Sequence, residues 1–416
     1  AAKYHLTLAR YYHTGFQLSA AGEVLTLTRP DGSTADTVGF GILPRDVSYG
    51  RPAEESQVWR FFAQPTPGRS NSTPGSTAFL TAPEFSHPAG FFPSEFVLTL
   101  STDSVGAEIR YTLDGSEPSA TAALSSGSLR IGSRTGTPNG ISSIPTTPGG
   151  PLPTGEVFKG WVIRARTFKP GALPSEVVTR SFFVTPSGRA RYSVPVVSLV
   201  TDRDNFFSMD RGIYVPGTRG NYNQRGPEWE RPAFVELFET NNSVLVSQPV
   251  GVKIHGNTSQ NFPIKGLDLD ATAFTGRRHF TARLFPDRAR TDYEHVLLRP
   301  TGHDQLYAFQ RDELMQSLLE PFGVETQAAR LVVVFINGEY WGLHYLKDKQ
   351  DTAFVAQATG ISEDELDYLE GYAVPRAGNL VRWNEMMAYL QTHDLTDTAH
   401  YAWMTNCLDP VNYALY

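Results

Sequence analysis

Short stretches of alternating hydrophobic and polar residues, separated by turn-forming residues, open the chain. Such stretches lie at 24–28, 37–40 and 59–62, and Pro30-Asp31-Gly32-Ser33 separates the first two. Alternation with a period of two is typical of half-buried β-strands. We therefore expect a small β-domain over residues 1–72, followed by a polar linker.

The same pattern continues in a second block over residues 83–184. The alternating stretches are 96–100, 109–113, 162–166 and 177–184. Regular short strands with turns between them predict a small antiparallel sandwich. Within this block, residues 125–155 are rich in Gly, Ser, Thr and Pro, and they predict a long mobile surface loop.

The pattern changes after Pro186, where strands are followed by helices. Expected strands lie at 194–200, 212–215, 233–238 and 250–255, and Asn337-Gly338 predicts a hairpin between 331–336 and 340–346. Expected helices lie at 308–322, 352–358, 363–370, 380–393 and from Thr398 onward. This order predicts an α+β domain over 187–416, with an N-lobe at 187–350 and the start of a C-lobe at 351–416.

Composition narrows the class of protein. The 416 residues carry a net charge of −7 with no basic stripe, which excludes a nucleic-acid-binding surface. No apolar run is long enough for a membrane-spanning helix. The single cysteine, Cys407, excludes a disulfide scaffold and a cysteine-based zinc site. The chain starts without Met and stops inside a predicted helix, so we expect a fragment open at both ends.

Lys265 is the first candidate for chemistry. It follows Pro263 and enters a strand in which it shares one face with Leu267 and Leu269. A partly desolvated ammonium there would seek an anion such as a phosphate. The alternative is a lysine at a strand end whose head stays in water. The residues alone leave both open.

Two acidic residues open the helix predicted after Gln310. Asp312 and Glu313 are favoured in a first turn by the helix dipole. Alternatively, one of them pairs with Lys265, as the strand lysine and helix acid do in protein kinases. The stretch 345–349, which includes Lys347 and Asp348, would then be a hinge whose backbone meets adenine, or else an ordinary charged connector.

Several ordered motifs resemble the CotH (spore coat protein H) kinase family. They lie at 193–202, 212–215, 228–233, 251–256, 261–265, 311–312 and 337–343. The resemblance implies an atypical protein kinase that uses ATP and Mg or another divalent metal and phosphorylates Ser/Thr of coat or surface proteins. Asp268 stands where the family usually has a basic residue, and Asp348 where it often has Glu. The family's catalytic and metal-binding aspartates would follow Tyr416, so we expect this fragment to be inactive.

Two further resemblances concern the preceding domains. The motif 109–118 with 163–166 is similar to the chitobiase/β-hexosaminidase C-terminal module, an immunoglobulin-like sandwich. The motifs 16–23, 46–51 and 65–68 resemble the rear part of a lamin-tail domain, also immunoglobulin-like. Because the first strands of that family would precede Ala1, an exposed sheet edge is expected near the amino terminus.

Two functions follow from these interpretations. In the first, the protein is a bacterial extracellular or surface kinase. Lys265 contacts the ATP phosphates, and Arg299 adds a second phosphate contact. Asp312 or Glu313 orients the lysine, and the nucleotide site is completed by Lys347 and Asp348. In the second, it is a non-catalytic exported adhesin or envelope scaffold. The expected partners are a Ser/Thr protein substrate and, through the sandwiches, cell-surface or glycan contacts.

Overall fold

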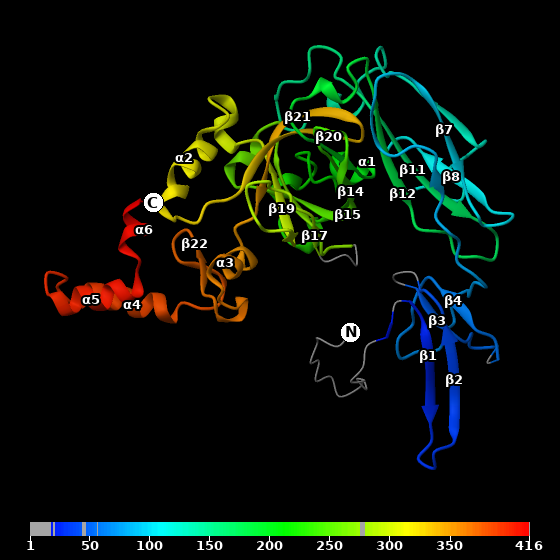
Figure 1. Cartoon of the computed structure of the whole chain (residues 1–416), viewed down its shortest axis with the longest axis horizontal. Coiled ribbons are helices and arrows are strands. Elements are labelled where there is room, and N and C mark those ends of the chain that lie inside the picture. Colours follow the sequence, from blue (N-terminus) through cyan, green and yellow to red (C-terminus); the bar gives the residue numbers. More distant parts are fainter. Residues whose placement is uncertain (1–17, 20, 44–46, 56, 275–278, 416) are drawn as a thin grey trace.

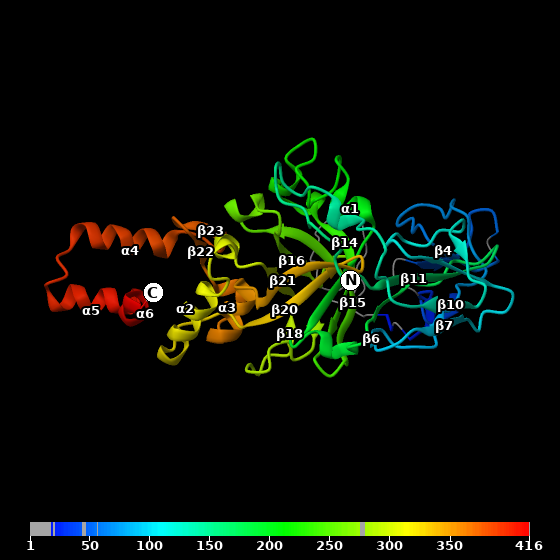
Figure 2. The same ribbon diagram turned by 90° about the horizontal axis from the view of Figure 1, so that it is seen from above.

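The structure is a computed structural model of the whole chain, and it describes residues 18–19, 21–43, 47–55, 57–274 and 279–415. A β-barrel occupies the centre, a two-sheet module lies on one side of it, and helices α3 to α6 extend on the other side (Figure 1, Figure 2). Among the described residues, no helix has the length and apolar character needed to cross a membrane.

The first region contains two small hairpins. They are formed by β1 (Glu23–Thr28) with β2 (Thr34–Phe40), and by β3 (Ser48–Gly50) with β4 (Arg60–Phe62). The expected strands at 24–28, 37–40 and 59–62 therefore occur. Val24 and Leu27 on β1 are 70% and 66% exposed. Residues 1–17, and with them Phe16 of the lamin-tail-like motif, lie outside the described residues, as does Asp46.

The second module consists of two sheets around a shared core. Its strands are β5 (Glu84–Phe85), β6 (Gly90–Phe92), β7 (Phe96–Ser101), β8 (Glu108–Thr112), β9 (Ala123–Leu124), β10 (Ser128–Ile131), β11 (Trp161–Phe168) and β12 (Val178–Val184). One sheet has the order β10-β7-β5 and the other β6-β12-β11-β8-β9. Leu98 of the first sheet and Ile163 of the second belong to one buried apolar cluster. Pairing is antiparallel except between β6 and β12.

A closed seven-stranded barrel follows. Its strands are β13 (Val196–Val200), β14 (Arg231–Phe238), β15 (Val244–His255), β16 (Gly266–Asp270), β19 (His295–Arg299), β20 (Ala329–Ile336) and β21 (Glu339–Asp348). They are ordered β13-β14-β15-β16-β19-β21-β20, and the parallel pair β13–β20 closes the ring. The interior is apolar and includes Leu199, Val252, Leu267, Leu298 and Leu346.

The strand expected at 212–215 is absent. Short helix α1 (Arg203–Phe207) follows β13, and the backbone N–H groups of Ile213 and Tyr214 donate to carbonyls of Asn205 and Phe206 in that helix. These backbone groups are therefore not available for a sheet. The apolar side chains that suggested a strand are instead buried in the barrel core cluster.

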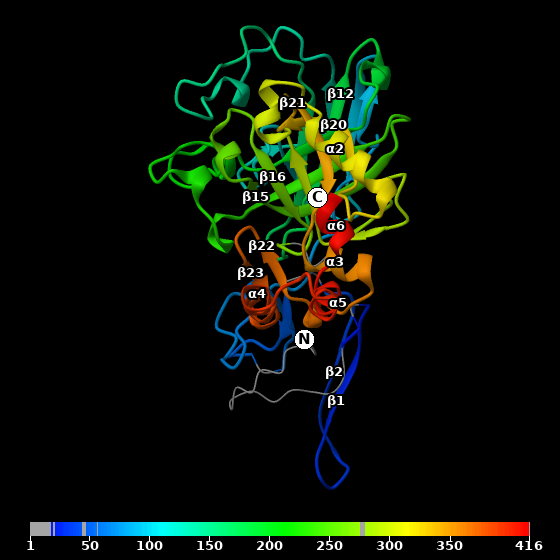
Figure 3. The same ribbon diagram turned by 90° about the vertical axis from the view of Figure 1, so that its left-hand side faces the viewer.

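Helix α2 (Arg311–Leu319) confirms the expected helix and ends in a 3₁₀ turn before Gly323, whose φ is +75°. Its orientation is unexpected for an amphipathic helix. Leu314 and Leu318 are 51% and 56% exposed, whereas Asp312 and Glu313 face the barrel through contacts described below. Figure 1 shows α2 on the side of the barrel from which the later helices extend, and in the view of Figure 3 it lies in front of the barrel.

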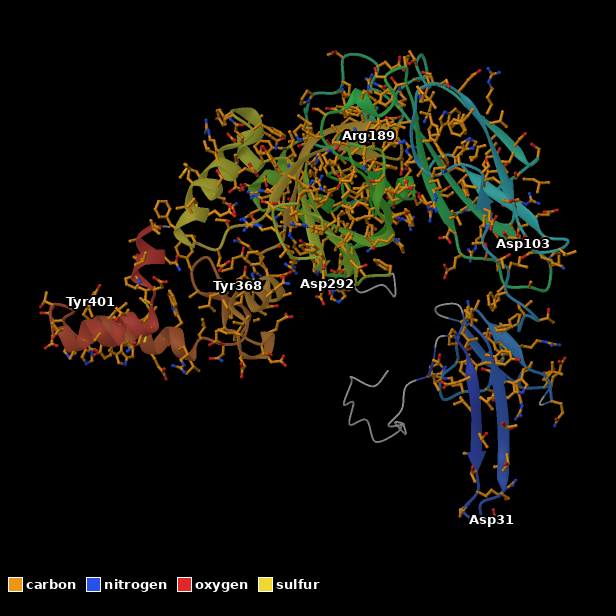
Figure 4. The ribbon with its side chains drawn as sticks, in the orientation of Figure 1. Asp31, Asp103, Arg189, Asp292, Tyr368 and Tyr401 are labelled. Atoms are coloured by element: carbon orange, nitrogen blue, oxygen red, sulfur yellow. The ribbon has the colours of Figure 1, made fainter. Side chains whose placement is uncertain are left out.

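The remaining helices follow the barrel. They are α3 (Thr352–Thr359), α4 (Val381–Thr392), α5 (Thr398–Cys407) and α6 (Pro410–Leu415). The helix expected at 363–370 is wrong. A 3₁₀ turn at Glu363–Glu365 leads instead into β22 (Tyr368–Glu370), which pairs with β23 (Val374–Ala377). Tyr368, labelled in Figure 4, donates its hydroxyl to the Gln350 carbonyl, which holds this hairpin against the end of the barrel.

An aromatic cluster joins the second module to the barrel. Phe91 and Phe183 of the module belong to the same buried cluster as Phe238 and Phe335 of the barrel. Arg189 lies at this junction (Figure 4) and donates to backbone carbonyls of residues 192, 194 and 239. The module and the barrel thus share a core rather than being joined by a free linker.

The expectation of a mobile loop over 125–155 is wrong for its central part. The segment contains β10 and a 3₁₀ turn at Ile141–Ser143, and both Ile141 and Ser142 are buried. The backbone N–H groups of Gly140 and Ser142 donate to the carboxylate of Glu339 on β21. The segment is therefore bound to the barrel surface.

Candidate functional site

One outer face of the barrel is strongly charged. Alternate residues of β16, β19 and β21 point away from the apolar interior, because side chains alternate between the two faces of a strand. On this face lie Asp268 and Asp270 of β16, Arg299 of β19 and Lys347 of β21. Helix α2 contacts the same face.

The centre of this face is an ion-pair cluster between two strands and α2. Lys347 Nζ lies 2.6 Å from Asp312 Oδ2 and 3.1 Å from Glu313 Oε1. Arg299 Nη1 donates to the same Asp312 Oδ2 at 2.9 Å. Gln316 Nε2 donates to the other Asp312 oxygen at 3.0 Å. Both basic residues are thereby joined through one carboxylate.

The members of this cluster differ in exposure. The Lys347 side chain is fully buried, while those of Arg299 and Asp312 are 35% and 34% exposed. Burial alone would raise the pKa of Asp312. The hydrogen bond and the charge of Lys347 outweigh this effect, helped by Gln316 and Arg299, so the pKa is lowered overall. The Asp312 carboxylate therefore stays ionised, and the accessible cation of the cluster is Arg299.

Lys265 does not take part in this cluster, so the expected pairing with Asp312 or Glu313 is wrong. Its side chain is fully buried, and Nζ donates to the Phe262 carbonyl at 2.7 Å and lies 4.2 Å from the centre of the Tyr222 ring. Burial without an acidic partner lowers the pKa of Lys265 to about 7. Of the two alternatives for Lys265, the structure has the buried ammonium, and its partners are a carbonyl and an aromatic ring rather than an anion.

A second charged group surrounds Asp268. Its carboxylate accepts from Lys349 Nζ at 2.8 Å and pairs with His295 Nδ1 at 3.0 Å. Burial opposes ionisation of Asp268, but His295 and the neighbouring lysines outweigh it and lower the pKa. Asp268 is thus paired with Lys349, Lys253 and His295 from neighbouring elements. Sequence reasoning missed this group because its members lie up to 96 positions apart.

The connection between β15 and β16 lies next to the Arg299 end of β19. Thr258 of this connection contacts His303 Nε2 at 3.2 Å, and the Phe262 ring packs edge-on against the His303 ring. A Cβ added to Gly302 would lie 3.4 Å from Arg299 Nη2 and 3.8 Å from Ser259 Cβ. Residues 256–262 therefore form a loop, called here the covering loop, that lies beside the Arg299 guanidinium.

The predicted hinge begins later than expected. Residues 345–348 belong to β21, which pairs with both β19 and β20. The Asp348 N–H donates to the Ala328 carbonyl, and its own carbonyl accepts from Gln327 Nε2. Arg290 Nη1 donates to both carboxylate oxygens of Asp348, at 3.0 Å each. Burial raises the pKa of Asp348 to about 6, although the charge of Arg290 opposes the shift. The connector between β21 and α3 therefore starts only at Lys349.

The charged face does not fit a divalent metal. Its aspartates are already paired with lysine, arginine or histidine side chains. Within the described part of the chain, no group of three or more His, Cys, Asp or Glu residues is arranged to hold a metal ion.

Two protein-family models match parts of the sequence. The family model described as CotH kinase protein matches residues 252–409, from within β15 to just after α5. The model described as Fn3 associated matches residues 98–182 of the second module. No curated protein matches the sequence. The chitobiase-like and lamin-tail-like assignments stay predictions, and the region from β15 to α5 is similar to the CotH kinase family, which supports a CotH-type, kinase-like protein.

Proposed function

We propose that the barrel and the following helices form the nucleotide-binding part of a CotH-type protein kinase. The reaction would transfer the γ-phosphoryl group of ATP to a Ser or Thr hydroxyl of a protein. The observation that carries this proposal is the ion pair between Arg299 on β19 and Asp312 on α2, found within the segment that matches the CotH kinase family.

The order of elements supports the proposal. Strands β15, β16 and β19 are neighbours in an antiparallel arrangement, α2 follows β19, and the β20–β21 hairpin then returns so that β21 pairs with β19. Protein kinases place a lysine on the third strand and pair it with an acid of the next helix, which orients the ATP phosphates. The ion pair between Arg299 on β19 and Asp312 on α2 resembles this arrangement, with an arginine in place of the lysine, and this likeness supports the proposal.

Each charged residue of the cluster has a distinct proposed role. Arg299 binds phosphate oxygens, because its guanidinium is partly exposed and presents paired N–H donors. Asp312 orients Arg299. Lys347, fully buried, holds Asp312 and Glu313 and so fixes α2 against the barrel. The covering loop lies over the phosphates. Lys265 is assigned no direct phosphate contact, since its Nζ is turned to Phe262 and Tyr222.

The proposal is tested by titration calorimetry of the 416-residue chain with ATP. We expect Arg299→Ala to weaken ATP binding about tenfold or more, since a charge-assisted bond to phosphate is worth about 1.5–3 kcal/mol. The matched control is Arg130→Ala, which removes an exposed arginine paired with Glu95 in the second module. Equal ATP affinity of Arg299→Ala and the unaltered chain would overturn the role of Arg299.

The second candidate is a non-catalytic surface scaffold. The aromatic cluster that joins the second module to the barrel favours it, because it makes a rigid multidomain body. Folded protein that binds no ATP would support this candidate. A bacterial extracellular or surface location, a Ser/Thr protein substrate and glycan contacts through the β-modules are part of the proposal and rest on the family resemblance.

A further inference from the structure

The second module reaches across the barrel and holds the connection that contains the covering loop. Thr146 Oγ1 donates to the Pro263 carbonyl at 2.8 Å, and Thr147 Oγ1 donates to the Asn261 carbonyl at 2.7 Å. Both threonines are buried. Two consecutive residues of one module thus satisfy two backbone acceptors of the other.

The contact is also sterically close. A Cβ added to Gly150 would lie 3.2 Å from Pro263 Cγ. The backbone N–H of Gly150 donates to the Thr147 carbonyl, which turns the chain at this point. The segment 140–150, called here the anchor segment, therefore packs directly on the residues that end the covering loop.

The anchor segment is itself fixed to β21. Glu339 is buried, and its two carboxylate oxygens accept from Gly140 N at 2.6 Å and Ser142 N at 2.8 Å. A carboxylate bound by two backbone N–H groups is a strong, charge-assisted contact. The position of the anchor segment is thus set by the strand that carries Lys347, and the segment in turn sets the position of the covering loop.

The covering loop has few hydrogen bonds of its own. Within it, Gln260 N donates to the Asn257 carbonyl at 3.3 Å, and Phe262 N donates to the Ser259 carbonyl at 3.2 Å. Such long turn bonds hold a loop weakly. The shape of the loop therefore also depends on contacts from outside, among them those of Lys265 Nζ with the Phe262 carbonyl and of Thr147 Oγ1 with the Asn261 carbonyl.

We infer that Thr146 and Thr147 of the second module are positioning residues for the covering loop, holding it in the shape that closes over the phosphates of a bound nucleotide. The role in nucleotide binding rests on the proposed function; the anchoring of the loop does not. The second module is in this way part of the site, so its removal would impair ATP binding although it supplies no phosphate contact.

Hydrogen exchange of the 416-residue chain without nucleotide tests the anchoring. We expect Thr146→Val/Thr147→Val to speed exchange at residues 257–262 about tenfold, since each lost hydrogen bond is worth about 1 kcal/mol. Thr146→Ser/Thr147→Ser keeps both hydroxyls and should restore slow exchange. The matched control is Thr135→Val, a threonine exposed in the same long segment. Unchanged exchange at 257–262 in the double valine variant would overturn the inference.

ATP titration of the same variants separates this inference from the proposed function. We expect the double valine variant to bind ATP about tenfold more weakly and the double serine variant to bind as the unaltered chain does. If the unaltered chain binds no ATP, the proposed function fails, while the exchange result still decides the anchoring. If the double valine variant does not fold, two single variants take its place. They are Thr147→Val and Glu339→Gln, and the second loosens the anchor segment from β21. Each should speed exchange at residues 257–262.

Discussion

Lys347 and Asp312 form the shortest ion pair on the charged face of the barrel, with Nζ 2.6 Å from Oδ2. The lysine lies on β21 and the aspartate on the first turn of α2, 35 residues earlier in the chain. Because the ammonium is fully buried, it depends on this carboxylate and on Glu313 for its charge compensation. The pair is thus the main polar link between α2 and the barrel.

Replacing Lys347 by Met should destabilise the protein by about 2–3 kcal/mol. The change leaves Glu313 without its cation, whereas Asp312 keeps its ion pair with Arg299. The loss of stability is therefore smaller than the cost of leaving a buried charge with no partner at all. Urea denaturation followed by circular dichroism measures it. Lys169→Met, at an exposed lysine that bonds the Val105 carbonyl, is the control and should change stability by less than about 0.5 kcal/mol. A similar small change in Lys347→Met would contradict the assigned role.

The stability of the protein should depend on the protonation of Glu236. This residue of β14 is fully buried, and burial raises its pKa to about 7 from the ordinary 4.5, while Ser181 and Arg180 of the second module offset the shift only in part. Between pH 4.5 and 7 the unfolded carboxyl is ionised while the folded one stays protonated. The free energy of unfolding should therefore fall as pH rises through this window, by about 3 kcal/mol at most.

Comparison of Glu236→Gln with the unaltered chain isolates this effect. The amide cannot ionise, so the variant should be more stable than the unaltered chain at pH 8, and this advantage should shrink by up to about 3 kcal/mol at pH 4.5. The difference between the two proteins removes contributions from other titrating groups such as Asp348. A stability difference that is equal at both pH values would show that Glu236 does not titrate in this range.

The first hairpin should promote self-association. Val24 and Leu27 are exposed on a two-stranded ladder, and such apolar edge strands pair readily with other chains. Val24→Lys/Leu27→Lys should lower the aggregated fraction in light scattering without lowering the melting temperature. Val105→Lys removes an 87% exposed valine from the second module and serves as control. Equal aggregation of the two variants would point to an origin outside the hairpin.

The sequence predicts local elements well because their signals are local. The Asn337-Gly338 hairpin, helix α2 and the four longest strands of the second module, β7, β8, β11 and β12, follow from turn residues and periodicity. The closed barrel was not predicted. It depends on the parallel contact between β13 and β20, which joins residues about 137 positions apart and leaves no local signal.

Most residues of the candidate site were predicted from the sequence, but the ion pairs that they form with each other were not. Arg299, Asp312, Glu313 and Lys347 do meet, yet Lys265 was expected where Lys347 lies. The run Lys347-Asp348-Lys349 suggested a connector because three charged residues follow one another. The alternation of Leu346, inside, with Lys347, outside, was the signal that could have placed the lysine on a strand face.

The turn at Gly338 should be intolerant of a side chain, because the second module packs on it. Gly338 has φ +79°, and an added Cβ would lie 2.6 Å from the Gly160 carbonyl oxygen. Its own carbonyl accepts from Gly160 N at 2.7 Å. Gly338→Ala therefore combines left-handed strain with a backbone clash, and it should cost about 3 kcal/mol or more.

Gly323→Ala separates the two causes. Gly323 has φ +75° and nothing within 4 Å of an added Cβ, so alanine there should cost only the conformational strain of about 1 kcal/mol. Denaturation of both variants measures the difference, which reports the contact between the hairpin and the second module. Since Glu339 follows Gly338 directly and binds the anchor segment, Gly338→Ala should also speed hydrogen exchange at 140–147. Equal costs for the two alanines would mean that the second module yields at Gly160 and does not hold the hairpin rigidly.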